Sequence, residues 1–560
     1  MTDSLRNHLL TVSCYVVIFT ATARQVPAVE FSAVAEVLED RCLSCHDSET
    51  RKGGIDLSPL TEPQHSSYGE HTELWIKLER KVRRGEMPPS KRRPLKPAEK
   101  DAIESWFHQS FVLRDGQRHI GPTPLRRLTR YEFERTLEDV LAIQLRTRHR
   151  DFVQPRLEAS KITTIVPSDL PGDSGFDNDA HRMETLRPPL KELAQAVSFA
   201  LKKFAESPEA QQAVLGRANV PKDASGSEVR ELLETFASRA YRGQLQRAKS
   251  NTEVFFEIYK RHVNDTEDSR ASFWRVLNMV LLSPEFLYRF ETSQKRKTPY
   301  AVSGIELATR LSYFLWAAAP DDELLKLGRS GQLLKDEVLK AQVARMLSSP
   351  RRLSLSENFA GQWLGFDELL SNDEFLKSER WNRETYDEAL FFFDELIKSD
   401  RSFLELVQSD WIYKRASELR KKRLGYEPIE SDTAKSPYAD VLTRKPTQGK
   451  KRRGRYNPPV LVRTKIDHEG GLITSAAILR LTASKDRTSP IRRGVWILEK
   501  IIGKELEVPP NVPSLDEARS ALKLIERPTV AQVIEQHVSK PQCVSCHKEI
   551  DPLGLGLENP

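Results

Sequence analysis

Apolar residues recur at helical spacing through most of the chain, and no strand-rich section interrupts them between Pro122 and about Glu430. Three stripes are clearest, because each places its apolar residues on one side of a helix. They consist of Leu307, Leu311, Phe314, Leu315 and Ala318; of Leu339, Val343, Met346 and Leu347; and of Tyr386, Ala389, Leu390, Phe393, Leu396 and Ile397. Each stripe is typical of a core-facing helix rather than of a cofactor pocket. The pattern predicts a mainly α fold with a large helical body.

A shorter helical pattern runs from Glu30 to roughly Arg114. It predicts three helices: one carrying Phe31, Val34, Val37 and Leu38 on one face, one from Leu74 to Val82 that ends at the Arg83–Gly85 break, and one that begins near Pro97 and carries Trp106. These are the proportions of one small module.

The N-terminus has the pattern of a secretory signal peptide, which we place at residues 1–23. Leu9–Thr20 is apolar but too short to cross a bilayer, and Ala21–Ala23 supplies small residues for cleavage. A buried N-terminal helix is the alternative. The signal peptide predicts an exported protein, periplasmic or on the cell surface. No apolar run in the chain reaches the length of a spanning helix, so we expect no transmembrane span.

Composition narrows the functional classes. The chain has 560 residues, a net charge of +7 and a hydrophobic fraction of 39%, which together indicate several folded domains. The charge is small for this length, so we expect no nucleic-acid partner. The basic run at residues 450–455 (KKRRGR) lies in a polar linker and favours, at most, anionic glycans or an acidic redox partner.

The five cysteines carry the most specific signal. Cys14 lies inside the predicted signal peptide, and the other four form two C-x-x-C-H motifs at residues 42–46 (CLSCH) and 543–547 (CVSCH). This spacing is typical of covalent haem c attachment, in which two thiols bind the two vinyl groups and the following histidine binds the iron. The predicted attachment residues are Cys42, Cys45, Cys543 and Cys546, with His46 and His547 as iron ligands. A zinc site or a disulfide within each motif is the competing interpretation.

A sixth ligand is predicted only for the first haem. Met87 precedes Pro88 about forty residues after His46, and its thioether is a soft ligand that raises the potential of haem iron. His71 is the alternative, and packing in a core is the bland interpretation of Met87. For the second haem, His468 and His537 are the candidates.

The first module resembles the planctomycete cytochrome C domain family. The resemblance rests on the Cys42–His46 motif, the glycine pair after it, residues 84–89 (RGEMPP) and the closing helix with Trp106. It implies a class I cytochrome c-like helical module at the front of a larger exported protein.

The rest of the chain resembles the planctomycete domains of unknown function that follow such cytochromes. The phrases that carry this resemblance are 125–132 (LRRLTRYE), 175–178 (GFDN), 236–242 (FASRAYR), 282–289 (LSPEFLYR), 308–316 (ATRLSYFLW), 359–364 (FAGQWL), 470–475 (GGLITS), 488–496 (TSPIRRGVW) and 551–560 (DPLGLGLENP). In that family the chain usually continues past the last phrase, so we expect a truncated or split product. No catalytic residue is established for these domains.

The expected organisation follows from these patterns. We expect a signal peptide at 1–23, a cytochrome c-like haem domain at 24–115, helical domains of unknown function at 116–190, 191–295 and 296–430, a basic polar linker at 431–458, and a C-terminal domain with the second haem motif at 459–560. Breaks are expected at Thr164–Gly175, Pro208–Ser227 and Ser293–Pro299.

No residue in the helical body can be named as catalytic from sequence. Asp177 and Asp179 offer oxygen atoms to calcium, but an Asx-rich turn fits them better. Asp321 and Asp322 resemble a helix N-cap more than a catalytic pair.

Three functions remain. We expect an exported di-haem c-type protein that transfers electrons between redox partner proteins. The alternatives are a peroxidase-like haem enzyme with an open second iron, and a cell-surface polysaccharide-related protein with an accessory cytochrome module.

Overall fold

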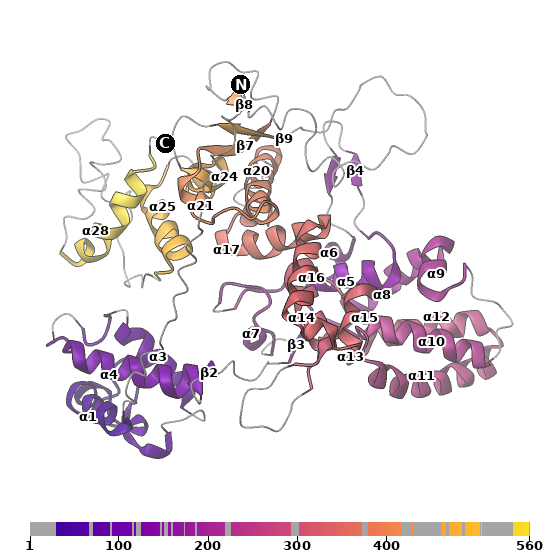
Figure 1. The fold of residues 1–560 in the computed structure, drawn as a ribbon, viewed down its shortest axis with the longest axis horizontal. Coiled ribbons are helices and arrows are strands. Elements are labelled where there is room, and N and C mark those ends of the chain that lie inside the picture. The colour runs from indigo at the N-terminus through magenta and orange to yellow at the C-terminus, as the bar shows by residue number, and fades with distance from the viewer. Residues whose placement is uncertain are drawn as a thin grey trace, which may run out of the picture. The chain divides into compact units, whose positions relative to one another are not determined.

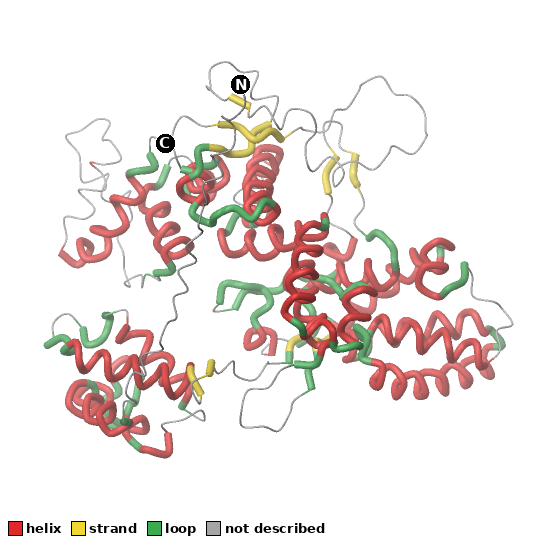
Figure 2. Tube along the Cα trace, viewed as in Figure 1, coloured by secondary structure: helices red, strands yellow, loops and turns green. Residues whose placement is uncertain are grey.

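The fold was analysed in a computed structural model. It describes residues 30–65, 71–83, 85–89, 92–114, 117–118, 125–145, 148–150, 155–157, 161–172, 174–184, 187–218, 226–292, 302–371, 379–415, 427–428, 461–465, 470–483, 488–504, 506, 532 and 541–558. Helices make up most of these residues and the strands are short, which confirms the mainly α prediction (Figure 2). The predicted signal peptide and the 431–458 linker lie outside the described residues. No helix in the described ranges is both long and apolar enough to cross a bilayer.

The chain divides into two compact units. The first comprises residues 1–123 with 293–301, and the second comprises 124–292 with 302–560. The finer domain boundaries stay predictions.

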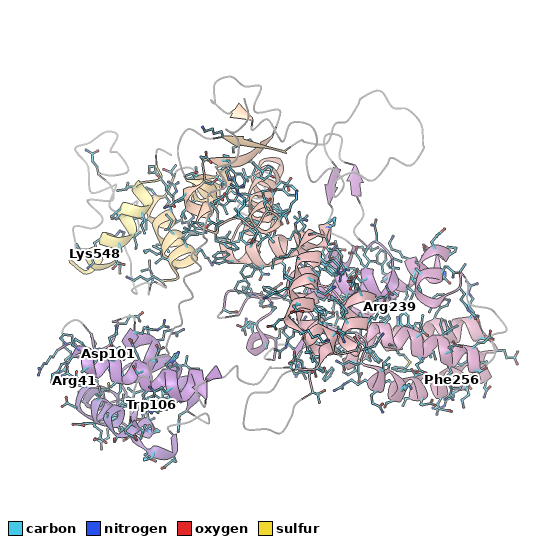
Figure 3. The ribbon with its side chains drawn as sticks, in the orientation of Figure 1. Arg41, Asp101, Trp106, Arg239, Phe256 and Lys548 are labelled. Carbon is cyan, nitrogen blue, oxygen red and sulfur yellow. The ribbon has the colours of Figure 1, made fainter. Side chains whose placement is uncertain are left out.

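The first unit is a small helical module around one aromatic core. Its elements are α1 (Phe31–Arg41), α2 (Leu43–His46), η1 (Lys52–Gly54), η2 (Ser58–Thr61), η3 (Pro63–His65), α3 (Thr72–Arg83), α4 (Pro97–Phe107), η4 (His108–Val112), β1 (Leu113–Arg114) and β2 (Gln117–Arg118) (Figure 1). Val34 and Leu38 of α1 are fully buried against Trp75 of α3 and Trp106 of α4. The two indole rings lie 4.5 Å apart, and Figure 3 labels Trp106 inside this core. The three predicted helices are confirmed.

The second unit begins with a helical body. Its elements are β3 (Arg126–Arg127), α5 (Arg130–Leu141), β4 (Arg148–Arg150), β5 (Pro155–Leu157), α6 (Lys161–Ile165), α7 (Ala180–Glu184), α8 (Leu190–Ala205), α9 (Pro208–Leu215), α10 (Gly226–Ala240), α11 (Leu245–Thr266), α12 (Ser269–Leu282), α13 (Pro284–Leu287) and β6 (Tyr288–Arg289). Helix α11 packs against both α10 and α12, and α8 packs on α12 (Figure 1). Within the break expected at Pro208–Ser227, residues 208–215 form α9, which Ser207 caps and whose first turn contains Pro208.

The remainder of the second unit has two further cores. Its elements are α14 (Gly304–Trp316), α15 (Asp322–Arg329), η5 (Gln332–Leu334), α16 (Asp336–Ser348), η6 (Pro350–Arg352), η7 (Leu355–Ala360), α17 (Gly361–Leu364), α18 (Glu368–Ser371), α20 (Glu379–Lys398), α21 (Glu405–Gln408), β7 (Trp411–Arg415), β8 (Glu427–Pro428), β9 (Leu461–Lys465), η9 (Gly471–Thr474), α24 (Ala476–Leu481), α25 (Pro490–Trp496), η10 (Ile497–Ile502) and α28 (Pro541–Leu555). Strand β9 pairs antiparallel with both β7 and β8.

The three predicted apolar stripes differ in how completely the fold buries them. Helix α20 buries its predicted stripe almost completely, and Met346 of α16 is fully buried. In α14 the prediction is wrong for Phe314, whose side chain is 64% exposed. Helix α14 also ends at Trp316, since Ala317 takes a left-handed conformation, so Ala318 reaches the core from outside the helix. Asp321 is the N-cap of α15, as predicted, because its carboxylate accepts from the Leu324 amide.

Candidate haem sites

The first C-x-x-C-H motif faces a cavity of about 630 Å³ inside the first unit. All four residues predicted for this site line the cavity: Cys42, Cys45, His46 and Met87. Pro88 and Pro89 lie on the same wall as Met87, while Leu57, Leu78 and Val82 supply apolar lining. The fold therefore brings together two segments that are about forty residues apart in sequence.

Helix α1 positions the motif. Val34 and Leu38 anchor α1 in the core, and the Cys42 amide continues the helical pattern by donating to the Leu38 carbonyl at 2.9 Å. The amide of His46 then donates to the Cys42 carbonyl, and the His46 carbonyl accepts from the Leu57 amide at 2.7 Å. The backbone of the motif is thus held at both ends.

The Met87 segment is tied to the end of α3. The amides of Glu86 and Met87 both donate to the Lys81 carbonyl, at 2.9 and 3.2 Å. Gly85 makes this turn possible, because its φ of 71° lies in the left-handed region that glycine adopts without strain. Met87 is 37% exposed in this structure, so the bland interpretation of Met87 as a core residue is wrong.

The donor atoms of the first motif fit a covalently attached haem. Neither Cys42 nor Cys45 is in a disulfide. Burial raises the pKa of the Cys42 thiol to about 11, although the charge of Arg41 opposes this shift. The Nδ1 atom of His46 is buried and has no hydrogen-bond partner. His71, the alternative ligand, is not among the described residues that line the cavity.

Basic side chains surround the same cavity. The lining includes the basic residues Lys52, Lys77, Lys81, Arg92 and Arg93. The acidic residue among the lining side chains is Asp40. Lys81 is paired with Glu86, and the Arg41 guanidinium donates to the Pro94 carbonyl at 2.6 Å, which ties the 92–95 segment to α1. An anionic group in this cavity would therefore meet an excess of positive charge.

The second motif begins helix α28. The side chain of Cys543 lies outside the described residues, and Cys546 is not in a disulfide. His547 and Asp551 lie one helical turn apart, and the His547 Nδ1 atom is 2.9 Å from Asp551 Oδ1. Both side chains are mostly buried, 11% and 14% exposed. His468 and His537, the candidate sixth ligands, lie outside the described residues.

Close packing on α25 fixes the position of α28 (Figure 1). A Cβ atom on Gly494 would lie 2.1 Å from the Ile550 carbonyl oxygen, and one on Gly554 would lie 1.9 Å from the Pro490 carbonyl oxygen. Only glycine permits backbones to approach this closely. Arg493 is 1% exposed and donates to Glu558 at 2.8 Å and to the Leu557 carbonyl at 3.0 Å. This explains Gly554 and Glu558 of the 551–560 phrase.

The helical body contains a buried ionic cluster that the sequence did not reveal. Arg126 of β3 binds Glu132 of α5 through two hydrogen bonds of 2.7 and 2.8 Å. Burial alone would raise the pKa of Glu132, but Arg126 outweighs burial and holds it below its usual value. Burial, reinforced by the charge of Glu132, raises the pKa of Asp177 to about 7. Asp177 also accepts from the Gln362 side chain at 3.1 Å.

Asp177 and Asp179 take part in hydrogen bonds around the turn that precedes α7. Asp179 accepts from the Ser174 hydroxyl at 2.8 Å, within the turn that precedes α7. In the part of the chain that the structure describes, no three His, Cys, Asp or Glu side chains gather as metal ligands. The turn interpretation of Asp177 and Asp179 fits this geometry.

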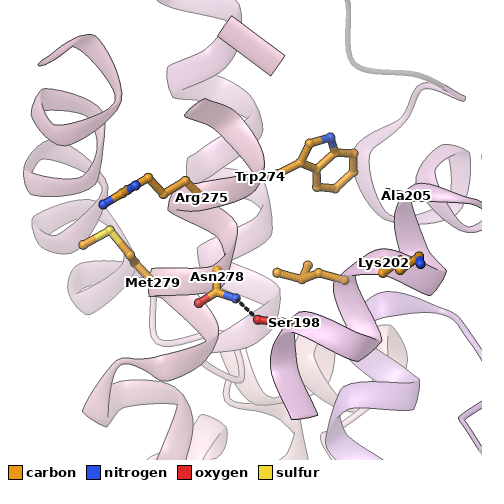
Figure 4. Close-up of a pocket in the computed structure, with 8 residues that line it drawn as sticks. Ser198, Lys202, Ala205, Trp274, Arg275, Asn278 and Met279 are labelled. Atoms are coloured by element: carbon orange, nitrogen blue, oxygen red, sulfur yellow. Dashed lines mark hydrogen bonds between the residues drawn. The ribbon is translucent and has the colours of Figure 1, made fainter. Parts of the chain in front are cut away.

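A second cavity of about 680 Å³ lies between α8 and α12 (Figure 4). Trp274, Arg275 and Met279 of α12 line it together with Lys202 of α8, and Asn278 donates to the Ser198 hydroxyl at 3.2 Å. It contains none of the residues predicted from sequence to bind haem. Trp274 packs its ring edge-on against Phe204, which is a core contact.

Comparison with known protein families finds matches to three parts of the second unit. Residues 228–291 match the family described as a protein of unknown function (DUF1595), residues 302–419 match DUF1592, and residues 469–559 match DUF1588. No curated protein and no solved structure matches the chain. The resemblance of residues 24–115 to a cytochrome C domain stays a prediction. The three matched families are planctomycete cytochrome-associated domains, and the DUF1588 match contains the second C-x-x-C-H motif.

Proposed function

We propose that this protein is an exported di-haem c-type cytochrome that transfers electrons between redox partner proteins. The observation that carries the proposal is the cavity of the first unit, because it collects Cys42, Cys45, His46 and Met87 from two separate segments. A volume of about 630 Å³ lies within the range of cofactor pockets. Haem iron supplies the reversible ferric–ferrous exchange of one electron.

Each residue of the first site has a definite role in this proposal. The thiols of Cys42 and Cys45 would hold the haem as thioethers, each adding sulfur to one carbon of a vinyl double bond and hydrogen to the other, so attachment would need no oxidant. His46 and Met87 would supply the two protein ligands of the iron. The basic residues around the cavity favour the haem propionates and an acidic redox partner.

Haem attachment is tested by producing the full chain in a host that matures c-type cytochromes. A pyridine haemochrome assay is expected to show two thioether-linked haems per chain. Cys42→Ser with Cys45→Ser is expected to leave one, and Cys543→Ser with Cys546→Ser the other. Bound zinc without haem would refute the proposal.

A second candidate function is a peroxidase-like haem enzyme at the C-terminal motif. The observation that favours it is the hydrogen bond between His547 and Asp551, because a carboxylate partner makes a metal-binding histidine more basic. Carbon monoxide and cyanide titrations of the protein separate the two functions. Binding at the second haem supports the enzyme, whereas two six-coordinate haems that bind neither ligand leave electron transfer.

A cell-surface or polysaccharide-related role is the third possibility raised by the sequence. The described structure offers it no distinct site, and a glycan-binding screen with anionic polysaccharides tests it. Export is tested directly by fractionation of the producing cells, with the protein expected in the periplasm or on the surface.

A further inference from the structure

We propose that Asp551 is a positioning residue for His547 that makes the second haem iron the lower-potential iron of the two. This inference rests on the proposed function. The juxtaposition behind it is local and well defined: His547 Nδ1 and Asp551 Oδ1 are 2.9 Å apart, on one face of α28.

The hydrogen bond is shielded from water. The side chains of His547 and Asp551 are only 11% and 14% exposed, whereas Val544 on the same helix is 47% exposed. A hydrogen bond to a charged acceptor is stronger in such a partly buried setting than at the surface. It also selects the tautomer in which Nδ1 carries the proton, which directs the lone pair of the other ring nitrogen, Nε2, to a metal.

The packing of α28 keeps the carboxylate in place. Ile550, which precedes Asp551, is 5% exposed and lies against Gly494 of α25. Gly554 makes the next close backbone contact, against Pro490, and Arg493 holds Glu558 beyond the end of the helix. Asp551 therefore lies between two fixed points of the helix crossing.

The first motif lacks this arrangement. His46 Nδ1 is buried without a hydrogen-bond partner, and the residue four positions later is Thr50. The neighbouring Asp47 uses its carboxylate to accept from the Glu49 amide at 3.1 Å and from the Thr50 amide at 2.5 Å. The Nδ1 atom of His547 thus has a carboxylate partner and that of His46 has none, although the two motifs share the C-x-S-C-H pattern.

This difference has a direct consequence for the two irons. A histidine that donates to a carboxylate is a stronger electron donor, and a stronger donor stabilises the ferric state. Met87, a soft ligand that favours the ferrous state, lines the cavity of the first motif. Transfer of an electron from the second haem to the first is then thermodynamically favourable.

The test uses the two single-haem proteins described above, so that each potential is measured alone by spectroelectrochemical titration. The second haem is expected to have the lower potential. Asp551→Asn keeps the size and a hydrogen-bond acceptor but removes the charge. It is expected to weaken the ferric preference about tenfold, which equals about 59 mV for a one-electron couple.

Glu549→Gln is the matched control, because Glu549 lies on the same helix, is 40% exposed and pairs with Lys504 rather than with His547. It removes one negative charge from the same helix without touching the histidine. Equal shifts in Asp551→Asn and Glu549→Gln, or no shift in either, would overturn the inference. A shift confined to Asp551→Asn supports it.

Two readouts keep the outcomes distinct. If the unaltered protein carries no second haem, the proposed function of that motif fails and the inference falls with it. If the haem is attached, the potentials of the two single-haem proteins test the inference without any change at Asp551. A lower potential at the second haem than at the first supports the inference, and equal potentials overturn it.

Discussion

The glycine contact between α25 and α28 provides the sharpest test of the second site. In Gly554→Ala the new Cβ atom would lie 1.9 Å from the Pro490 carbonyl oxygen and 2.5 Å from the carbonyl carbon. Both atoms belong to backbone, so a side-chain rotation cannot relieve the contact. The helices must separate by roughly 1 Å or more, since such Cβ contacts are ordinarily no closer than about 3 Å.

The expected cost follows from the measured effects of overpacking, about 1–3 kcal/mol. With 1.36 kcal/mol per tenfold change, the α25–α28 contact is expected to open about 5- to 150-fold more often. Amide hydrogen exchange in α28 reports this opening directly. It is preferable to a global melt, because a chain of several domains does not unfold in one step.

Gly556→Ala is the control for this substitution. It lies in the same phrase just after α28, and its nearest contact would be the Pro552 carbonyl oxygen at 3.2 Å. Little loss of protection is expected there. If Gly554→Ala loses no more protection in α28 than Gly556→Ala does, the packing argument for the second site is wrong.

Four further predictions follow from the described residues. Met87→Ala is expected to lower the potential of the first haem and to remove its sulfur ligand from the near-infrared spectrum, while Met87→His is expected to restore six-coordination at a lower potential; an unchanged spectrum would assign the ligand elsewhere. Arg352→Met leaves the fully buried Asp394 without its 2.7 Å partner and is expected to cost about 3–5 kcal/mol in chemical denaturation, with exposed Arg230→Met as a near-neutral comparison. Because the pKa of Asp177 is raised to about 7, the folded state binds this proton more tightly than the unfolded state does. The free energy of unfolding therefore falls as pH rises from the ordinary pKa of an aspartate to about 7. Asp177→Asn is expected to flatten this slope in unfolding experiments measured across pH. Val34→Ala in the core under the first motif is expected to cost about 2 kcal/mol and to reduce haem incorporation, whereas exposed Ile76→Ala on α3 is expected to change neither.

Local patterns predicted the helices well where one face is buried. The first unit shows this, because its three helices each place a continuous apolar face on the Trp75–Trp106 core. The same reasoning failed for Phe314, since periodicity records which residues share a face and not whether that face is covered. It also missed the short helix α9 inside the break expected at Pro208–Ser227, because a proline in the first turn of a helix looks locally like a break.

Strand pairing was beyond local reasoning as well. Residues 411–415 pair with residues 461–465 across a long polar segment, and neither strand was predicted. Their pairing depends on partners about fifty residues away, whose positions no short window contains. The Arg126–Glu132 cluster illustrates the same limit, because its pKa shifts arise from burial that only the folded chain creates.

The sequence by itself determined the chemistry that rests on short spacing. Two C-x-x-C-H motifs place two thiols and an imidazole within five residues, and helical geometry alone puts Asp551 one turn from His547. Only the tertiary structure decided which distant residues join them. Met87 reaches the cavity of Cys42 because α3 and its glycine turn fold back onto α1, and His547 keeps its carboxylate in a buried setting because α28 packs on α25 through glycine. Spacing along the chain fixes which residues lie within one helical turn of each other, whereas burial and long-range contacts exist only once the chain has packed.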